Sequence, residues 1–224
     1  MQSRPFLKWA GGKTRLLNQY EHLFPRSFLN YHEPFLGSGA VFFKLKSGNL
    51  IKTAQLADSN NELVNCYRIV RDALPDIILE LSKHQHKHSK EYFYNIRSLD
   101  PINLDPVVRA GRTIYLNKTC FNGLFRLNKQ GQFNVPLGRY SRPAILDINR
   151  LTLASNALKG TKISTANYVS IIDRAQYKDF VYMDPPYYPT SKTANFTSYT
   201  SSSFTELDHR ELATVVQNLT ISGI

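Results

Sequence analysis

The chain of 224 residues is predicted to belong to the α/β fold class. Residues 29–57 follow the pattern of a strand, a glycine-containing loop, a helix and a second strand. The strand pattern returns late in the chain, at residues 162–166 and 180–183. Between these regions the alternation of strands and helices is lost. We therefore expect a Rossmann-like sheet into which a mainly helical domain, containing a β-hairpin, is inserted.

The first part of the predicted sheet contains a glycine loop. Residues 29–35 form a short strand that leads into the loop LGSG at residues 36–39. Residues 40–47 form a helix whose apolar side chains share one face, and residues 51–57 form a buried strand that ends at Asp58. This order is typical of one unit of a parallel sheet.

Helices and one hairpin are predicted for the central region. Residues 60–73 have helical periodicity, and helical character continues over residues 77–83 after a break at Leu74-Pro75-Asp76. Residues 125–128 and 132–135 form two short strands around a glycine turn.

The last part of the chain returns to the sheet pattern. Residues 162–166 and 180–183 are predicted strands, with a helix at residues 168–174 between them, and residues 205–218 form a further helix. The domains expected from this order are a sheet domain of residues 1–74 and 160–224 and an inserted domain of residues 75–159.

The composition indicates a polyanionic partner. The formal net charge is +11 and the sequence pI is about 9.6, which favours nucleic acid. A membrane surface is the alternative, but no basic amphipathic helix supports it and no apolar run approaches transmembrane length. Cys66 and Cys120 form no spaced ligand set, as is typical of a reducing cytoplasm.

The positive charge is concentrated in the predicted insert. Residues 106–146 contain no Asp or Glu but seven Lys or Arg side chains. Aromatic side chains are interleaved with them, which suits a surface that holds phosphates and meets unstacked bases. A solvated basic face with core aromatics is the alternative interpretation.

The segment KWAGGKT, at residues 8–14, resembles the end of a phosphate-binding P-loop. The full P-loop pattern requires a glycine where the chain has Leu7, and a hydrophobic strand for which there is no room. A nucleotide hydrolase is therefore the weakest hypothesis, and Trp9 and Lys13 need another explanation.

The loop at residues 36–39 suits a cofactor that lies close to the backbone. It carries Gly37 and Gly39 and opens a helix, so that free N–H groups are available, although a structural turn would also explain two glycines. Asp58 follows about 20 residues later, at a strand end where an acid can bind ribose hydroxyls. This arrangement suits either NAD or S-adenosylmethionine.

The tetrapeptide Asp184-Pro185-Pro186-Tyr187 follows the predicted strand at residues 180–183. Proline cannot continue a central strand, so the motif is expected at the carboxyl edge of the sheet, where ligands bind. An aspartate, a carbonyl held between prolines and an aromatic ring suit an extruded adenine, because two acceptors can hold its exocyclic amine. The nitrogen lone pair can then attack a sulfonium methyl in line. Taken alone, the tetrapeptide could be only a turn.

With these motifs the sequence resembles the Dam-type DNA adenine-N6 methyltransferases, of the D12 class, over its whole length. The resemblance is carried, in the family's order, by FLKWAGGK, FLGSG, LADSNNELVNCY, YLNKTCFNGLFRLNKQGQFNVPLGRY and VYMDPPYYP. It implies double-stranded DNA as the partner, adenine in GATC as the target and S-adenosylmethionine as the methyl donor.

The resemblance also implies roles for individual residues. The target base would be held by Asp184, Pro185, Pro186 and Tyr187. S-adenosylmethionine would be contacted by Trp9, Lys13, Phe35, Gly37, Gly39, Asp58 and Asp184. DNA would be contacted by Lys8, Phe121, Asn122, Leu124, Arg126, Pro136, Arg139 and Tyr140. Phe121 would wedge into the opened duplex, and Arg126 would bind a guanine edge, as direct readout also favours.

Several alternatives accompany this interpretation. The resemblance implies a monomeric cytoplasmic enzyme of bacterial or phage origin without a metal, and leaves a restriction endonuclease partner open. Family members continue past the position of Ile224, so a catalytically inactive DNA-binding remnant is one alternative. A cytosine-N4 methyltransferase is another, although many such enzymes have serine at the position of Asp184. The alternating His84, His86 and His88 lack further ligands and are predicted to be a solvated segment.

Overall fold

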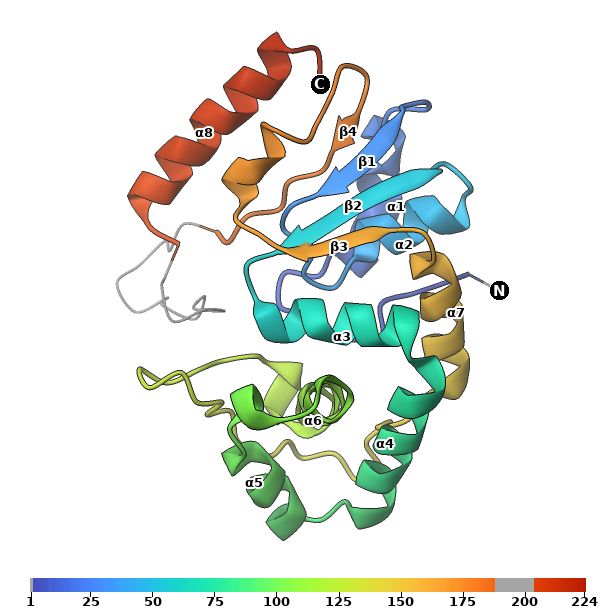
Figure 1. The fold of residues 1–224 in the computed structure, drawn as a ribbon, viewed down its shortest axis with the longest axis vertical. Helices are drawn as coiled ribbons and strands as arrows, with labels where there is room; N and C mark the ends of the chain where they lie inside the picture. Colours follow the sequence, from blue (N-terminus) through green and yellow to red (C-terminus); the bar gives the residue numbers. More distant parts are fainter. Residues whose placement is uncertain (1, 188–203) are drawn as a thin grey trace.

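The structure is a computed structural model that describes residues 2–187 and 204–224 (Figure 1). Within these ranges, four parallel strands form one sheet in the order β3-β2-β1-β4. The strands are β1 (Asn30–Glu33), β2 (Thr53–Asp58), β3 (Lys162–Thr165) and β4 (Phe180–Val181). The order proceeds outward from β1 to β3 and then returns to the other side of β1. This reversal lies between β1 and β4, and open α/β sheets bind ligands at the carboxyl ends of such strands.

The predicted unit of strand, loop, helix and strand is confirmed. The helix α2 (Ala40–Ser47) begins after Gly39, whose φ of 64° lies in the left-handed region. The prediction of one apolar face on α2 was too narrow, because the adjacent Phe42 and Phe43 are both fully buried. The helix also contacts α7 (Ile148–Leu158), so more than one of its faces is covered.

The region around β4 differs from the prediction. β4 ends at Val181, short of the predicted strand at residues 180–183. The helix predicted at residues 168–174 is only the 3-10 helix η5 (Tyr168–Ile171). The chain then turns toward Asp179, whose carboxylate accepts hydrogen bonds from the start of β1. This early anchoring to the sheet explains why the helix is short.

The central region is helical, as predicted. Its helices are α3 (Asn61–Asp72), α4 (Leu74–Lys87), α5 (Lys90–Ser98), α6 (Pro106–Thr119) and α7. In Figure 1, α3 lies between the sheet and the helices α4, α5 and α6, and it contacts β2 and β3 as well as α4 and α6.

The predicted break between α3 and α4 was misplaced. The non-helical residue is Ala73, with a φ of −134°, and Leu74 already begins α4. Pro75 lies in the first turn of that helix. A proline has no intrahelical hydrogen bond to lose at this position, so it starts a helix here and does not interrupt one.

The predicted hairpin is present as antiparallel pairing around a single bridge. Leu127 is bridged to Phe133, and the backbone N–H of Asn128 donates to the carbonyl of Gln132 at 2.8 Å. The turn between them contains Gly131 with a φ of 75°, which favours glycine.

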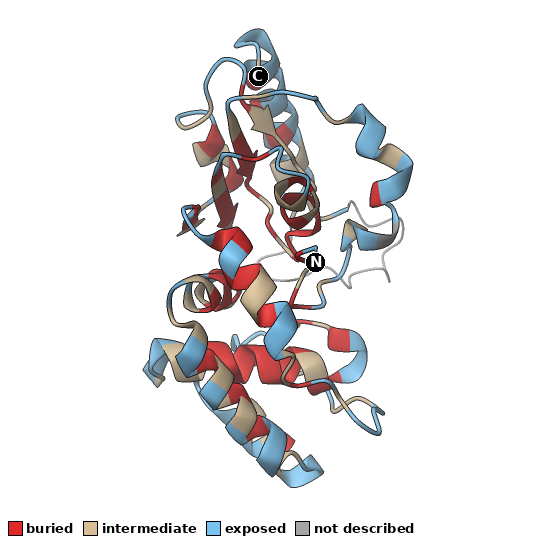
Figure 2. Cartoon of the chain, turned by 90° about the vertical axis from the view of Figure 1, so that its right-hand side faces the viewer, coloured by how far each residue is buried: buried red, intermediate tan, exposed pale blue. Residues whose placement is uncertain are grey.

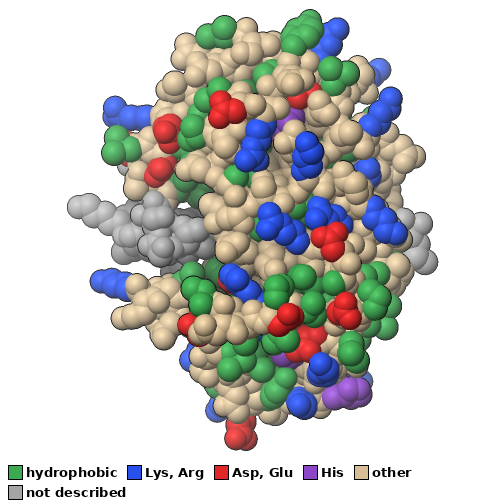
Figure 3. Space-filling view, viewed as in Figure 1, with side chains coloured by type: hydrophobic (Ala, Val, Ile, Leu, Met, Phe, Trp, Pro, Cys, Tyr) green, Lys and Arg blue, Asp and Glu red, His purple; other side chains and the backbone are tan. Residues whose placement is uncertain are grey.

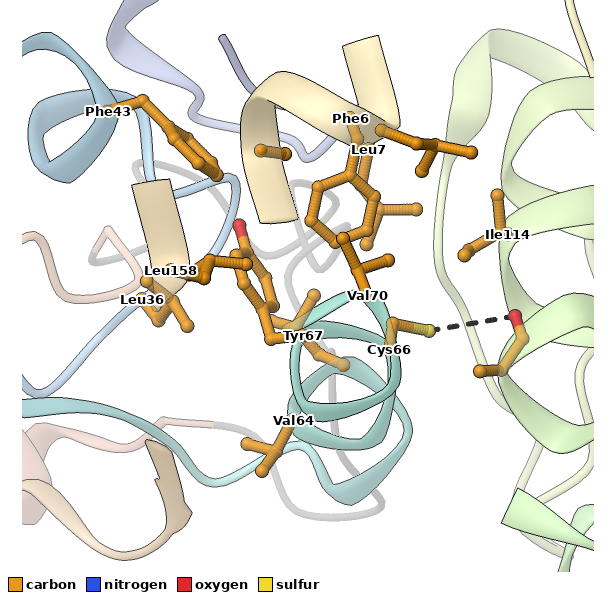
Figure 4. Close-up of a cluster of buried hydrophobic side chains, with 14 of the residues drawn as sticks. Phe6, Leu7, Leu36, Phe43, Val64, Cys66, Tyr67, Val70, Ile114 and Leu158 are labelled. Atoms are coloured by element: carbon orange, nitrogen blue, oxygen red, sulfur yellow. Dashed lines mark hydrogen bonds between the residues drawn. The ribbon is translucent and has the colours of Figure 1, made fainter. Parts of the chain in front are cut away.

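A large cluster of buried side chains joins the sheet to the helical layer. In Figure 4, Tyr67 and Cys66 of α3 lie among side chains that include Phe6 and Leu36. The Cys66 thiol donates to the carbonyl of Ala110 in α6 at 3.8 Å. Figure 2 shows that buried residues gather inside the sheet and the helical layer, while outer surfaces are exposed. Because α3 has buried residues toward both layers, it fixes one against the other.

A second cluster seats α8 (Glu206–Ile221) on η5. Leu212 and Val215 of α8 are buried in this cluster together with Tyr168 and Ile171. None of the helices in the described part of the chain combines the length and apolar character of a membrane span.

Strand β3 lies at one edge of the sheet and is anchored by arginines. Arg68 of α3 donates two hydrogen bonds to the carbonyl of Ile163, and Arg71 donates one to the carbonyl of Thr161. Figure 3 shows Lys and Arg side chains gathered over the part of the molecule where Figure 1 draws β3 and α3. Charged side chains at a sheet edge oppose pairing with another chain.

Candidate active site

A cavity of about 790 Å³ lies at the carboxyl ends of β1 and β4. Its volume lies within the range of small-molecule and cofactor sites. The residues that line it include Trp9, Lys13, Glu33, Phe35, Gly37, Asp58, Leu124, Tyr168, Asp184, Pro185, Pro186 and Tyr187. The cavity therefore brings together the predicted base-holding tetrapeptide and most of the residues predicted to contact the cofactor.

The carboxylate of Asp58 holds the glycine loop in place. The backbone N–H of Gly37 donates to one oxygen at 3.0 Å, and that of Asn60 donates to the other at 2.9 Å. Burial raises the pKa of Asp58 despite these hydrogen bonds. Gly37 and Gly39 have φ angles of 48° and 64°, and a Cβ on Gly37 would lie 3.1 Å from Trp9 Cδ1. The missing side chain of Gly37 leaves room for Trp9 at the cavity, whereas that of Gly39, which does not line the cavity, leaves room for Tyr67 of α3.

The ammonium of Lys13 is bound by the motif that follows β4. Its Nζ forms an ion pair with the Asp184 carboxylate and donates to the Tyr187 hydroxyl at 2.7 Å and to the Gly11 carbonyl at 2.9 Å. Desolvation lowers the pKa of Lys13, but hydrogen bonds to Asp184 and Tyr187 outweigh it, so that the pKa lies above its ordinary value. A substrate amine that donated a hydrogen bond to Asp184 would have to compete with this ammonium for the carboxylate.

Two aromatic stacks form walls of the cavity. Trp9 stacks on Phe125, with ring centroids 5.4 Å apart. Phe35 stacks on Tyr168, with ring centroids 5.2 Å apart. Leu124, predicted as a DNA contact, lines the same cavity. The central region of the chain thus contributes to the wall of a site that opens at the sheet.

Glu33 and Tyr168 line the cavity but were not among the predicted site residues. Glu33 is the last residue of β1 and is 3% exposed, and the Tyr31 hydroxyl donates to its Oε2 at 2.7 Å. Burial raises the pKa of Glu33 to about 8. An acid at the end of a buried strand, directly before Pro34 and the glycine loop, is a signal that could have identified it.

Five residues predicted to contact DNA lie together. The backbone N–H of Phe121 donates to the carbonyl of Pro136 at 2.9 Å, and Asn122 follows in a turn with a φ of 54°. Lys8 Nζ lies 4.5 Å from the ring centroid of Tyr140 and 3.4 Å from its hydroxyl. Phe121 is 48% exposed and Tyr140 is 37% exposed, so both rings can meet a ligand.

The remaining predicted DNA contacts lie in and beside the hairpin. Arg126 Nε donates to Asn134 Oδ1 at 2.7 Å, and its Nη2 donates to the Asn134 carbonyl at 3.4 Å. These bonds fix the direction of the guanidinium. Arg139 is exposed to solvent.

The histidines of α4 were predicted incorrectly in part. His84 is buried, and its Nδ1 lies 2.8 Å from the hydroxyl of Tyr92, whereas His86 is exposed. Burial lowers the pKa of His84 to about 4. The reason is that α4 continues to Lys87 and turns His84 into the helical layer. In the described part of the chain, no three His, Cys, Asp or Glu side chains are grouped so as to hold a metal ion.

Residues 9–223 match the family model of D12 class N6 adenine-specific DNA methyltransferases. This chain belongs to that family. The DNA adenine methyltransferase family acts on adenine, which overturns the cytosine-N4 alternative and the nucleotide hydrolase hypothesis.

Individual relatives of this DNA adenine methyltransferase agree with the assignment. The type II methyltransferase M.MjaIII of Methanocaldococcus jannaschii is 39% identical over 238 residues, covering 100% of this chain and 82% of the relative. The type II methyltransferase M1.LlaDCHI of Lactococcus lactis subsp. cremoris is 40% identical, covering 99% of this chain and 78% of the relative. A DNA adenine methylase of Salmonella typhimurium strain LT2 is 36% identical, covering 100% of this chain and 79% of the relative.

Proposed function

We propose that this chain transfers the methyl group of S-adenosylmethionine to N6 of an adenine flipped out of duplex DNA, within the sequence GATC. The observation that carries the proposal is the joint position of Asp184 and Tyr187 beside the glycine loop, on one cavity of about 790 Å³. Base and methyl donor could then be held in contact.

The tetrapeptide after β4 is proposed to hold the base. The Asp184 carboxylate and the Pro185 carbonyl are acceptors for the two N–H groups of the adenine amine, and the exposed Tyr187 ring offers a stacking surface. Holding the amine in this way directs its lone pair at the methyl carbon. The N–C bond forms as the C–S bond breaks, and one amine proton then leaves to solvent.

The acidic character of the cavity supports S-adenosylmethionine over NAD as the cofactor. Four carboxyl groups of the described residues line it, those of Glu33, Asp58, Asp184 and Asp208, and of these Glu33 holds a proton below a pH of about 8. S-adenosylmethionine supplies an electrophilic methyl group and carries a sulfonium and an ammonium, so nearby carboxylates favour its binding. NAD carries two phosphates, which these carboxylates would repel. We propose that Trp9, Phe35, Gly37 and Gly39 complete this site.

The second substrate is proposed to be duplex DNA, bound by the insert of residues 75–159 while residues 1–74 and 160–224 bind the cofactor. The exposed Phe121 is proposed to wedge into the duplex, and Arg126, whose guanidinium direction is fixed by Asn134, is proposed to bind a guanine edge. The relatives named type II methyltransferases support pairing with a restriction endonuclease in the source organism.

A protection assay tests the proposal. DNA is incubated with the protein and S-adenosylmethionine and is then digested with a nuclease that methylation of GATC blocks. We expect protection, and none when the cofactor is left out. DNA retention in a shift assay, without protection and without calorimetric binding of S-adenosylmethionine, would favour the inactive DNA-binding remnant.

A further inference from the structure

The side chain of Asn117, near the end of α6, joins two segments that are distant in the sequence. It is 2% exposed. Its Oδ1 accepts the backbone N–H of Lys8 at 2.9 Å, and its Nδ2 donates to the carbonyl of Lys8 at 2.7 Å and to that of Gly123 at 3.0 Å. The side-chain amide thus acts as acceptor and as donor, and holds two backbone segments at once.

The two segments contact each other directly as well. A Cβ on Gly123 would lie 2.6 Å from Lys8 Cδ and 2.7 Å from Lys8 Cβ, so the glycine lets the lysine stem pack against the turn. The φ of Gly123 is 64° and that of Asn122 is 54°. A left-handed conformation is unfavourable for a residue other than glycine, so the turn depends on the contacts around it.

The two segments together carry residues of both proposed ligand surfaces. Phe121 and Asn122, in the turn, belong to the proposed DNA surface. Trp9, which directly follows Lys8, lines the cavity proposed for the cofactor. Asn117 lines neither surface but is bonded to the backbone beside each.

We infer that Asn117 is a positioning residue that couples DNA binding to cofactor binding, by holding the turn of Phe121 in register with the segment of Trp9. The inference rests on the proposed function. A duplex that shifts the turn also shifts the two Lys8 peptide bonds, and with them Trp9. By linkage, the cofactor must then change the affinity for DNA by the same factor as DNA changes the affinity for the cofactor.

The experiment measures that factor. The Kd of S-adenosylmethionine is determined by calorimetry with and without a saturating short duplex that contains one GATC. Typical couplings between sites are about 5- to 150-fold, and we expect the wild-type ratio to lie in this range. In Asn117→Ala we expect the ratio to fall toward one, with a smaller change in the Kd measured without DNA.

A second variant and a matched control keep the test decisive. Asn117→Asp keeps the size of the side chain but places a carboxylate oxygen against the carbonyls of Lys8 and Gly123. This variant should also lose the coupling. In Asn65→Ala, the lost bond is likewise one from a side-chain amide to a backbone carbonyl, that of Pro106 at 2.9 Å, and neither residue lines the cavity or belongs to the proposed DNA contacts. This control should keep the wild-type ratio.

Trp9 is the sole tryptophan of the chain, so its fluorescence reports on this junction. We expect addition of the duplex alone to change the Trp9 emission in the wild type and not in Asn117→Ala. A wild-type ratio of one, or equal ratios in the wild type and the folded Asn117 variants, would overturn the inference. Failure of the wild type to bind either S-adenosylmethionine or the duplex would instead count against the proposed function.

Discussion

The ammonium of Lys13 pairs with the carboxylate of Asp184, although the two residues are 171 positions apart. The pair joins the segment that resembles a P-loop to the motif at the end of β4. The charge of Lys13 is therefore balanced by a carboxylate of the chain itself, and no bound phosphate is needed to balance it. Its cation also masks an acceptor that the proposed substrate amine requires, so substrate binding must redirect Lys13.

Replacing this lysine tests its proposed role. Lys13→Ala should weaken S-adenosylmethionine binding by about tenfold, the order of magnitude expected for a charge-assisted hydrogen bond. The neighbouring Thr14→Ala is the control and should bind normally, because Thr14 is exposed and does not line the cavity. Calorimetric titration measures both. A larger loss of S-adenosylmethionine binding in Thr14→Ala than in Lys13→Ala would contradict the proposed role of Lys13.

Loss of the Asp184 carboxylate should stop chemistry more than binding. In Asp184→Ala we expect the methyl-transfer rate to fall by about 100-fold or more, as when one transition-state contact is removed. DNA affinity in a shift assay should stay close to that of the wild type, since Asp184 lies inside the cavity. Equal losses in rate and in DNA affinity would mean that the residue supports the fold and not the reaction.

Glu33 should make stability depend on pH. Burial raises its pKa from 4.5 to about 8, so between these values the native state holds a proton that the unfolded state has released. The free energy of unfolding should therefore be highest, as far as Glu33 is concerned, below pH 4.5 and should decline as the pH rises to about 8. In Glu33→Gln, which keeps an acceptor for Tyr31, urea titrations should show a weaker decline. An identical slope in both proteins would rule out Glu33 as the cause.

Arg126 should contribute to sequence discrimination. Arg126→Ala is expected to reduce the preference for GATC over a site with one guanine replaced by about 1–3 kcal/mol. Lys129→Ala removes a nearby exposed charge and should weaken binding to both duplexes equally. Competition shift assays at fixed salt compare the two variants. If Arg126→Ala weakened binding to both duplexes equally, Arg126 would contact the DNA phosphates and not a guanine edge.

Gly39 should be sensitive to any side chain. Gly39→Ala adds a Cβ 2.9 Å from the Tyr67 hydroxyl at a φ of 64°, and should lower the free energy of unfolding by about 2–4 kcal/mol. Gly131→Ala is the control, since its φ is 75° but no atom lies within 4 Å of the added Cβ. It should cost only about 1–2 kcal/mol, from backbone strain. Similar losses of unfolding free energy in the two variants would show that the Tyr67 side chain moves away from the added Cβ at little cost.

Local sequence patterns predicted most of the sheet and the helix α2. The glycine loop and α2 follow from a strand, two glycines and an apolar run, all within one short stretch, and α2 has the predicted bounds. β4 was predicted too long because its end depends on pairing with β1 and on the turn anchored by Asp179. Such contacts leave no periodicity in the sequence.

The candidate site was predictable where its residues form motifs. Asp184 and Tyr187 belong to such a motif and do line the cavity, as does the isolated Asp58. Asn117 could not be predicted, because its role depends on bonds to Lys8 across 109 positions. His84 was assigned to solvent because its local sequence is polar, whereas packing against Tyr115 decides its burial.

The segment from Lys8 to Lys13 has a consequence for how the protein is made. It leaves the ribosome well before its partners Asn117 and Asp184. Contacts that span so much of the chain form slowly, because a large loop must close before they stabilise anything. During synthesis the sheet unit around α2 can form early, while the proposed catalytic site remains open until the sequence beyond β4 has emerged. A segment that is made before its partners is thus among the last to reach its place.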